Sequence, residues 1–304
     1  MSLRQIVDDA LAGSAAQDYA LFSFGEDTFL LLYCPYSPQQ DVVSAVDNYY
    51  PAYQQIRRVR LQIEEKLSSS YAVCNAGYTY KSLALLDGQM TVLANSLLAH
   101  PAYGTYFVME VVRLAGQWAS PSAVWDAQDQ ITKAALTAFP QDGEAWRRLS
   151  CERQSALCAH CGLCRSACPS GALDQGFSAQ KCVRTWQGKG FDVGTEEGKQ
   201  MGQRLLGCHS CQDVCPYNAH AVHVAPLIDG HQLFLAALEG KKGLLPFADC
   251  LGNNYLRPAK LLCLALNCAA NRKDDRYIQY MEQLLAFPDE RVSRAALAYR
   301  KALC

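Results

Sequence analysis

The pattern of hydrophobic and polar positions divides the chain into a mixed first third and a helical last third. Apolar residues at helical spacing predict a helix over 3–11, and two apolar runs flank Gly25-Glu-Asp, which predicts two strands joined by a turn. A charged amphipathic helix is predicted to begin at Pro51, and a further strand covers 106–112. Two shorter elements complete this region: a strand at 71–74 and a helix at 79–87. We therefore predict an α+β domain of the α/β sandwich type.

The last third contains apolar stripes at helical spacing, separated by breaks. The stripes lie at 231–238, 261–269, 277–285 and 292–303. Asp289 follows a proline and is predicted to cap the last helix. Helices joined by short connections predict a helical-repeat-like cap of the HEAT type. The segment from residue 256 onward has nine Lys or Arg and five Asp or Glu residues, a net charge of +4. A solvated helix surface explains this charge as well as nucleic-acid binding does.

Cysteines dominate the middle of the chain. Residues 158–169 have the C-x2-C-x2-C-x3-C-P spacing of bacterial two-cluster ferredoxins, in which the fourth cysteine ligates the other cluster. A second run, Cys208-His-Ser-Cys-Gln-Asp-Val-Cys-Pro, follows. Two-residue gaps let a tight loop bring several thiolates to one cubane. A structural zinc site is the alternative, but zinc needs four ligands and two C-x2-C pairs supply them. A run of four cysteines and a run of three, each ending in Cys-Pro, favour a ferredoxin-like module with two [4Fe-4S] clusters.

Exchange of the fourth ligands divides the cysteines into two sets. Cluster one is predicted to be held by Cys158, Cys161, Cys164 and Cys215. Cluster two then has Cys168, Cys208 and Cys211, and the cysteine between the runs, Cys182, is predicted to be its fourth ligand. Cys151 and Cys250 are weaker candidates, because neither lies between the two runs. A three-iron cluster, or an open iron, remains the alternative.

Composition limits the remaining classes of function. The 304 residues, half of them hydrophobic, suffice for two or three compact units, and the net charge of −1 provides no global attraction to nucleic acid or membrane. No signal peptide and no run of about eighteen apolar residues is present, so we expect a cytoplasmic protein without a membrane partner. The predicted domains are an α+β cofactor or substrate domain at 1–120, a helical linker or insertion at 121–150, the cluster module at 151–222 and the helical region at 223–304.

Several stretches resemble the epoxyqueuosine reductases, which are cobalamin-dependent iron–sulfur proteins that complete queuosine in tRNA and are related to reductive dehalogenases. The segment Gly202-Gln-Arg-Leu-Leu-Gly-Cys-His-Ser-Cys-Gln-Asp-Val-Cys-Pro-Tyr-Asn is similar to the family's second cluster run. The segments that begin at Phe29, Asn95 and Tyr103 are similar to its earlier segments, and Cys182 falls on its isolated cluster-two ligand. The resemblance implies two [4Fe-4S] clusters and makes cobalamin a candidate cofactor. It covers most of the chain, apart from 121–150.

Departures from the family concentrate in the substrate and cofactor half. Cys74 stands at the position of the family's catalytic aspartate, and the family's Asp-Tyr-His falls on Ala52-Tyr53-Gln54. The family's glycine-rich segment falls on residues 88–94, which keep one glycine. Cys74 is therefore either a changed proton donor or an inert thiol, and the cofactor-binding residues stay unassigned. Tyrosines in the same region are alternative acids: Tyr33, Tyr36, Tyr53, Tyr78 and Tyr80.

Three hypotheses follow. The first is an enzyme, an iron–sulfur oxidoreductase that passes electrons through two clusters to a corrinoid between the N-terminal domain and the cluster module, and then to an unknown substrate. The second is a non-catalytic electron-transfer protein. The third is an epoxyqueuosine reductase acting in tRNA queuosine biosynthesis; without the aspartate at Cys74 we do not expect this reaction. An electron donor such as ferredoxin or flavodoxin is the expected partner, and tRNA is a candidate that we do not favour.

Overall fold

A computed structural model describes residues 2–16, 18–39, 46–75, 80–120, 155–189 and 193–304. The chain forms two compact units. The sheet unit consists of Met1–Tyr36, Ala52–Gly162 and Pro216–Ala221, and the helical unit consists of Ser37–Pro51, Leu163–Cys215 and Val222–Cys304. The predicted α+β class is confirmed, whereas the predicted linker at 121–150 lies outside the described residues. None of the helices in the described ranges is long and apolar enough to cross a membrane.

The sheet unit is built on four antiparallel strands in the order β1-β2-β6-β3. These are β1 Asp18–Phe24, β2 Asp27–Pro35, β6 Phe107–Ala115 and β3 Val73–Cys74. Gly25 has a φ of 62° in the turn between β1 and β2, a conformation that glycine adopts without strain. β2 pairs on both sides, and its residues 28–34 are buried. A strand covered on both faces explains the continuous apolar run seen in the sequence.

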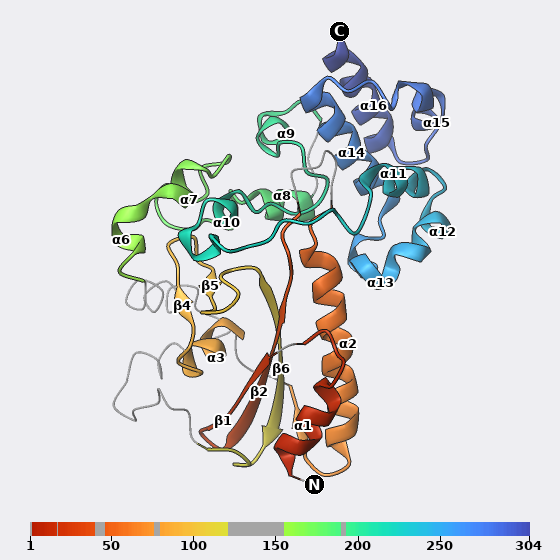
Figure 1. Cartoon of the computed structure of the whole chain (residues 1–304). Helices are drawn as coiled ribbons and strands as arrows, with labels where there is room; N and C mark the ends of the chain where they lie inside the picture. The colour runs from red at the N-terminus through yellow and green to blue at the C-terminus, as the bar shows by residue number, and fades with distance from the viewer. Residues whose placement is uncertain (1, 17, 40–45, 76–79, 121–154, 190–192) are drawn as a thin grey trace. The chain divides into compact units, whose positions relative to one another are not determined.

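Helices and a hairpin cover the two faces of this sheet (Figure 1). One face carries α1 Leu3–Leu11 and α2 Tyr49–Ser68, and α2 buries Ile56, Ile63 and Leu67. The other face carries α3 Tyr80–Leu86 and the hairpin of β4 Thr91–Val92 with β5 Leu98–Ala99. Predicted helix positions are confirmed here to within two residues. The hairpin was not predicted, because two-residue strands are too short to show a period.

The cluster module contains short helices joined by loops. They are α6 Cys158–Cys161, α7 Leu163–Ser166, α8 Val183–Lys189, α9 Glu196–Gln200, α10 Ser210–Asp213 and a 3₁₀ turn at Pro216–Asn218. Helices of four to seven residues are not stable alone in water. Their positions must therefore come from tertiary contacts and, in the loaded protein, from metal ligation.

The C-terminal part of the helical unit follows the predicted stripes. Its α-helices are α11 Gly230–Leu238, α12 Lys241–Leu244, α13 Ala248–Leu251, α14 Pro258–Arg272, α15 Met281–Leu285 and α16 Glu290–Leu303, with 3₁₀ turns at Leu245–Phe247, Asn253–Tyr255 and Ile278–Tyr280. α14 packs against α11 and α16 around a shared apolar core. Asp289 caps α16 as predicted, since its carboxylate accepts the Arg291 N–H at 3.0 Å. The predicted third helix is wrong in its first half, which is a 3₁₀ turn.

Candidate iron–sulfur centre and proton-donor region

Within the helical unit, α7 packs against α10, and this contact brings cysteines of the two runs together. Burial raises the pKa of Cys211 to about 12, with further contributions from neighbouring thiols. Those thiols belong to Cys208, Cys164, Cys182 and Cys168. Four of the five cysteines form the predicted set of cluster two. Several thiolates this close repel one another, so a bound metal cluster that neutralises them fits this donor set.

Cys182 lies immediately before α8, and its carbonyl accepts the backbone N–H groups of Thr185 and Trp186 at 2.9 and 3.1 Å. Its thiol also contributes to the raised pKa of Cys208. Cys182 stays the predicted eighth ligand. Cys250 instead packs against the apolar core of the C-terminal helices, and Cys151 lies outside the described residues.

Three predicted ligands of cluster one lie near the chain positions at which one unit ends and the next begins: Cys158 and Cys161 belong to the sheet unit and Cys215 to the helical unit. Cys158 and Cys161 are in α6, which ends at Gly162 with a φ of 66°, and Cys215 directly precedes the 3₁₀ turn. Across the ranges that the structure describes, no group of three or more His, Cys, Asp or Glu side chains converges as a site for a metal ion. The eight-ligand assignment therefore rests on the motif and on the proximity of the thiols around Cys211, and it stays a prediction.

The last two residues of the Cys-Pro-Tyr-Asn sequence, Tyr217 and Asn218, make hydrogen bonds within the sheet unit. The side chain of Asn218 accepts the Thr105 N–H at 2.7 Å and donates to the Thr105 hydroxyl at 2.8 Å. The hydroxyls of Tyr217 and Ser155 are 2.7 Å apart. Gly104 leaves room for this contact, because a Cβ there would lie 2.1 Å from the Asn218 Oδ1. The turn that follows Cys215 is thus anchored in the sheet unit, a role that the sequence did not reveal.

Replacement of Asn218 by alanine should destabilise this anchor. The change removes both hydrogen bonds and leaves the buried Thr105 N–H without its partner, which costs about 1–3 kcal/mol. We expect a lower melting temperature and a loss of iron on dilution, because the turn next to Cys215 loosens. Ser155→Ala is the comparison variant: it removes the hydroxyl pair with Tyr217 and the acceptor of the Leu157 N–H, both outside the buried interior, and should cost less. Equal stability and iron retention in Asn218→Ala and the unmodified chain would contradict the anchoring role.

Polar side chains organise the backbone around Cys208. The Gln187 side chain accepts the Gly207 N–H at 2.8 Å and donates to its carbonyl at 3.3 Å. Gly207 has a φ of 90°, and a Cβ there would lie 2.3 Å from the Asp47 Cβ. The buried His209 places its Nδ1 2.6 Å from the Asp213 carboxylate. Sequence reasoning missed these residues, because the ligand spacing says nothing about the side chains between the ligands.

Cys74, which stands at the family's acid position by sequence resemblance, ends the short strand β3. Its half-buried thiol lies 3.7 Å from the backbone carbonyl oxygen of Ala72. Among the tyrosine candidates, Tyr33 is buried and donates to Asp87 at 3.2 Å, so its pKa is raised by burial and then by that carboxylate. Tyr36 packs edge-on against Tyr106, and Tyr78 lies outside the described residues.

The other two tyrosine candidates meet at a buried carboxyl group. Glu110, on β6, is 3% exposed and accepts the Tyr80 hydroxyl at 3.2 Å, and Tyr53 is also hydrogen-bonded to it. The Arg60 Nε lies 3.0 Å from the same carboxylate. Burial raises the pKa of Glu110, and Arg60 opposes that rise. Burial, followed by Glu110, raises the pKa of Tyr80 to about 12. The sheet unit therefore holds a carboxyl–phenol group that the sequence analysis did not identify.

A partly buried lysine on α3, Lys81, was also missed by the sequence analysis. Lys81 donates to the Ser96 carbonyl at 2.6 Å, and burial lowers its pKa to about 8. Ser96 has a φ of 64°, which is uncommon for a residue other than glycine. Nothing in the local sequence marks Lys81, because its burial depends on the turn that Ser96 forms fifteen residues later.

Comparison with known proteins supports the double-cluster interpretation. Residues 157–218 match the family model of a 4Fe-4S double cluster binding domain. The predicted pair of [4Fe-4S] clusters is confirmed at this level. An epoxyqueuosine reductase of Bacillus subtilis (strain 168) is 45% identical over 65 residues, which are 20% of this chain and 17% of that relative. An uncharacterized protein of the gldA 3′ region of Geobacillus stearothermophilus is 45% identical over 64 residues, 20% of this chain and 29% of the relative.

These sequence matches span less than a third of each relative, whereas the structural similarity spans nearly the whole chain. Epoxyqueuosine reductase of B. subtilis, solved with its catalytic aspartate loop swung out of the active site, has a TM-score of 0.67 at 15% identity. The match covers 97% of this chain and 88% of that one. The resemblance to the epoxyqueuosine reductases is confirmed. A further epoxyqueuosine reductase, solved with an epoxyqueuosine-modified tRNA-Tyr stem loop, has a TM-score of 0.67 at 14% identity and covers 98% of this chain and 89% of its own. At these identities the likeness establishes the fold.

Proposed function

We propose that this chain is an iron–sulfur oxidoreductase of the epoxyqueuosine reductase type. The observation that carries the proposal is a double-cluster module within a fold that matches those enzymes over 97% of the chain. When bound, the two clusters supply one-electron transfer. The predicted ligands are Cys158, Cys161, Cys164 and Cys215 for cluster one, and Cys168, Cys182, Cys208 and Cys211 for cluster two. A small electron-transfer protein such as ferredoxin or flavodoxin is the proposed donor.

Epoxyqueuosine in tRNA is the substrate that the comparisons favour over an unknown one. The sequence relatives of the cluster module include epoxyqueuosine reductases, and one structural neighbour was solved with a modified tRNA stem loop. The net +4 of the segment from residue 256 onward adds some attraction to phosphates. This proposal reverses the expectation that we drew from Cys74 alone, in which the chain does not act on epoxyqueuosine.

A second candidate function is reduction of a different substrate through the same electron path. Cys74 favours it, because a reductase must deliver a proton as well as electrons, and the thiol differs from a carboxyl by about four pKa units in water. The group formed by Glu110, Tyr80 and Tyr53 offers another source of protons in the same unit. Such a site would suit a reaction in which the departing oxygen is protonated by an acid weaker than a carboxylic acid.

Cobalamin belongs to this proposal without an assigned set of contacts. The segment at 88–94, which replaces the family's glycine-rich stretch, forms the start of the β4–β5 hairpin and keeps only Gly88. Corrinoid binding is tested by adding cob(II)alamin to anaerobically reconstituted protein and recording the visible spectrum. A shifted spectrum with saturable binding supports a reductase, whereas an unchanged spectrum favours an electron-transfer protein without this cofactor.

The substrate is tested by complementation of a bacterial strain that accumulates epoxyqueuosine, with nucleoside mass spectrometry of its tRNA. Restoration of queuosine by the unmodified chain is the result expected for the first candidate. Restoration only by the Cys74→Asp variant would favour the second candidate, since the scaffold would then bind the tRNA but lack the acid. Failure of both variants, with both clusters present, would overturn the proposal of a tRNA substrate.

A further inference from the structure

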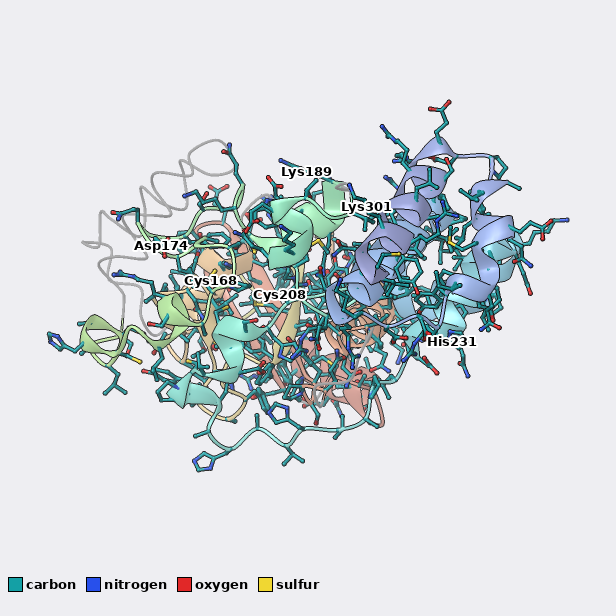
Figure 2. The ribbon with its side chains drawn as sticks, turned by 90° about the horizontal axis from the view of Figure 1, so that it is seen from above. Cys168, Asp174, Lys189, Cys208, His231 and Lys301 are labelled. Atoms are coloured by element: carbon teal, nitrogen blue, oxygen red, sulfur yellow. The ribbon has the colours of Figure 1, made fainter. Side chains whose placement is uncertain are left out.

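Two cysteines predicted to share cluster two have the same local partner. The Ser170 hydroxyl lies 3.7 Å from the Cys168 Sγ, and the Ser210 hydroxyl lies 3.7 Å from the Cys208 Sγ. In each case the serine follows its cysteine by two residues, although the two cysteines come from different runs. Figure 2 labels Cys168 and Cys208, and both belong to the helical unit, in which α7 packs against α10. Two equivalent contacts thus lie at one group of thiols.

Cluster binding determines the direction of both hydrogen bonds. A thiol and a hydroxyl can each donate, but a cysteine that ligates iron has lost its proton. The serine hydroxyl must then be the donor and the sulfur the acceptor. At Cys208 the Ser210 backbone N–H also donates to the sulfur, and Arg204 adds a positive charge nearby. The Ser210 hydroxyl, the Ser210 N–H and Arg204 each favour negative charge on that sulfur, because a donor or a cation beside an anion stabilises it.

We propose that Ser170 and Ser210 tune cluster two by donating hydrogen bonds to the sulfurs of Cys168 and Cys208, and thereby raise its reduction potential. Reduction adds one negative charge to the cluster and its sulfurs. Donors to the sulfurs therefore stabilise the reduced state more than the oxidised state, and hydrogen bonds to sulfur are among the factors that set cluster potentials. This proposal rests on the ligand set given under the proposed function. It adds the groups that set the reduction potential of one of the two clusters in the electron path.

The experiment measures both cluster potentials by redox titration followed by electron paramagnetic resonance, on anaerobically reconstituted full-length protein. Ser170→Ala and Ser210→Ala should each lower one of the two potentials and leave the other unchanged. For each variant we expect the equilibrium constant for reduction to fall by up to about tenfold, which is 59 mV for a one-electron couple. The double variant should show the sum of the two shifts, because the serines act on different sulfurs of one cluster.

Ser166→Ala is the matched control. Ser166 also follows a predicted ligand, Cys164, by two residues, but it is exposed on α7. The variants Ser210→Thr and Ser210→Val separate the effect of the hydroxyl donor from that of side-chain size. Threonine keeps the hydroxyl, and valine has nearly the same volume as threonine without it. Equal potentials in these two variants, or an equal shift of both clusters, overturns the inference. If Ser170→Ala and Ser210→Ala shift different clusters, the ligand sets are wrong, and this outcome is independent of whether the chain reduces epoxyqueuosine.

Discussion

Replacement of Cys74 by aspartate is expected to increase the rate of epoxyqueuosine reduction by about 10²–10⁴-fold, the usual contribution of a positioned general acid. The fold matches an epoxyqueuosine reductase whose catalytic loop carries an aspartate, and Cys74 falls on the family's acid position by sequence resemblance. Cys74 lies at the end of β3 with its thiol half-buried, so a carboxylate of similar size fits at this point of the chain. The measurement is single-turnover formation of queuosine in a tRNA stem loop, with the clusters reduced beforehand.

Cys74→Asn is the control for this prediction, because it has the shape of aspartate but does not exchange a proton near neutral pH. It should stay within a few-fold of the unmodified chain. Equal rates for Cys74, Cys74→Asp and Cys74→Asn would place the acid elsewhere. The buried Glu110 and its partner Tyr80 are then the groups to test, by Glu110→Gln and Tyr80→Phe, since they form the carboxyl–phenol group of the sheet unit.

Replacement of Cys182 by alanine is expected to remove cluster two or convert it into a three-iron cluster. Iron should fall from about eight atoms per chain to about four, or to about seven with a new signal in electron paramagnetic resonance of the oxidised protein. The physical reason is the lack of a third close cysteine in the second run, which leaves one corner of the cubane without a protein ligand. Loss of the cluster should also loosen α7 and α10, because convergent thiolates repel one another without metal.

Cys250→Ala is the matched control for Cys182→Ala. Cys250 is a weaker ligand candidate that packs against the apolar core of the C-terminal helices, so its replacement should lower stability slightly and leave the iron content unchanged. The opposite pattern, with iron lost in Cys250→Ala and retained in Cys182→Ala, would contradict the ligand assignment. Unchanged iron and spectra in both variants would leave Cys151 as the remaining candidate among those considered.

The sequence by itself determined the cluster chemistry and most of the longer regular elements. Ligand spacing is local, because three cysteines within seven residues can meet one cubane whatever the rest of the fold does. The same reason made two further features predictable: the pair of strands β1 and β2, and the helix cap at Asp289. Turn and capping residues act on their immediate neighbours in the chain. The third C-terminal helix shows the limit of this approach: its apolar spacing predicted an α-helix where the chain forms a 3₁₀ turn first.

Only the tertiary structure decided which polar groups meet. Asn218 reaches Thr105 across 113 positions, and Glu110 joins tyrosines that precede it by 30 residues or more. The serine contacts at Cys168 and Cys208 became comparable only because folding brings cysteines of the two runs near Cys211. Periodicity reports which face of an element is buried, but it does not report which distant side chain lies opposite. Hydrogen bonds and pKa values in the interior depend on that pairing and on exclusion of water, and both arise only when the chain has folded.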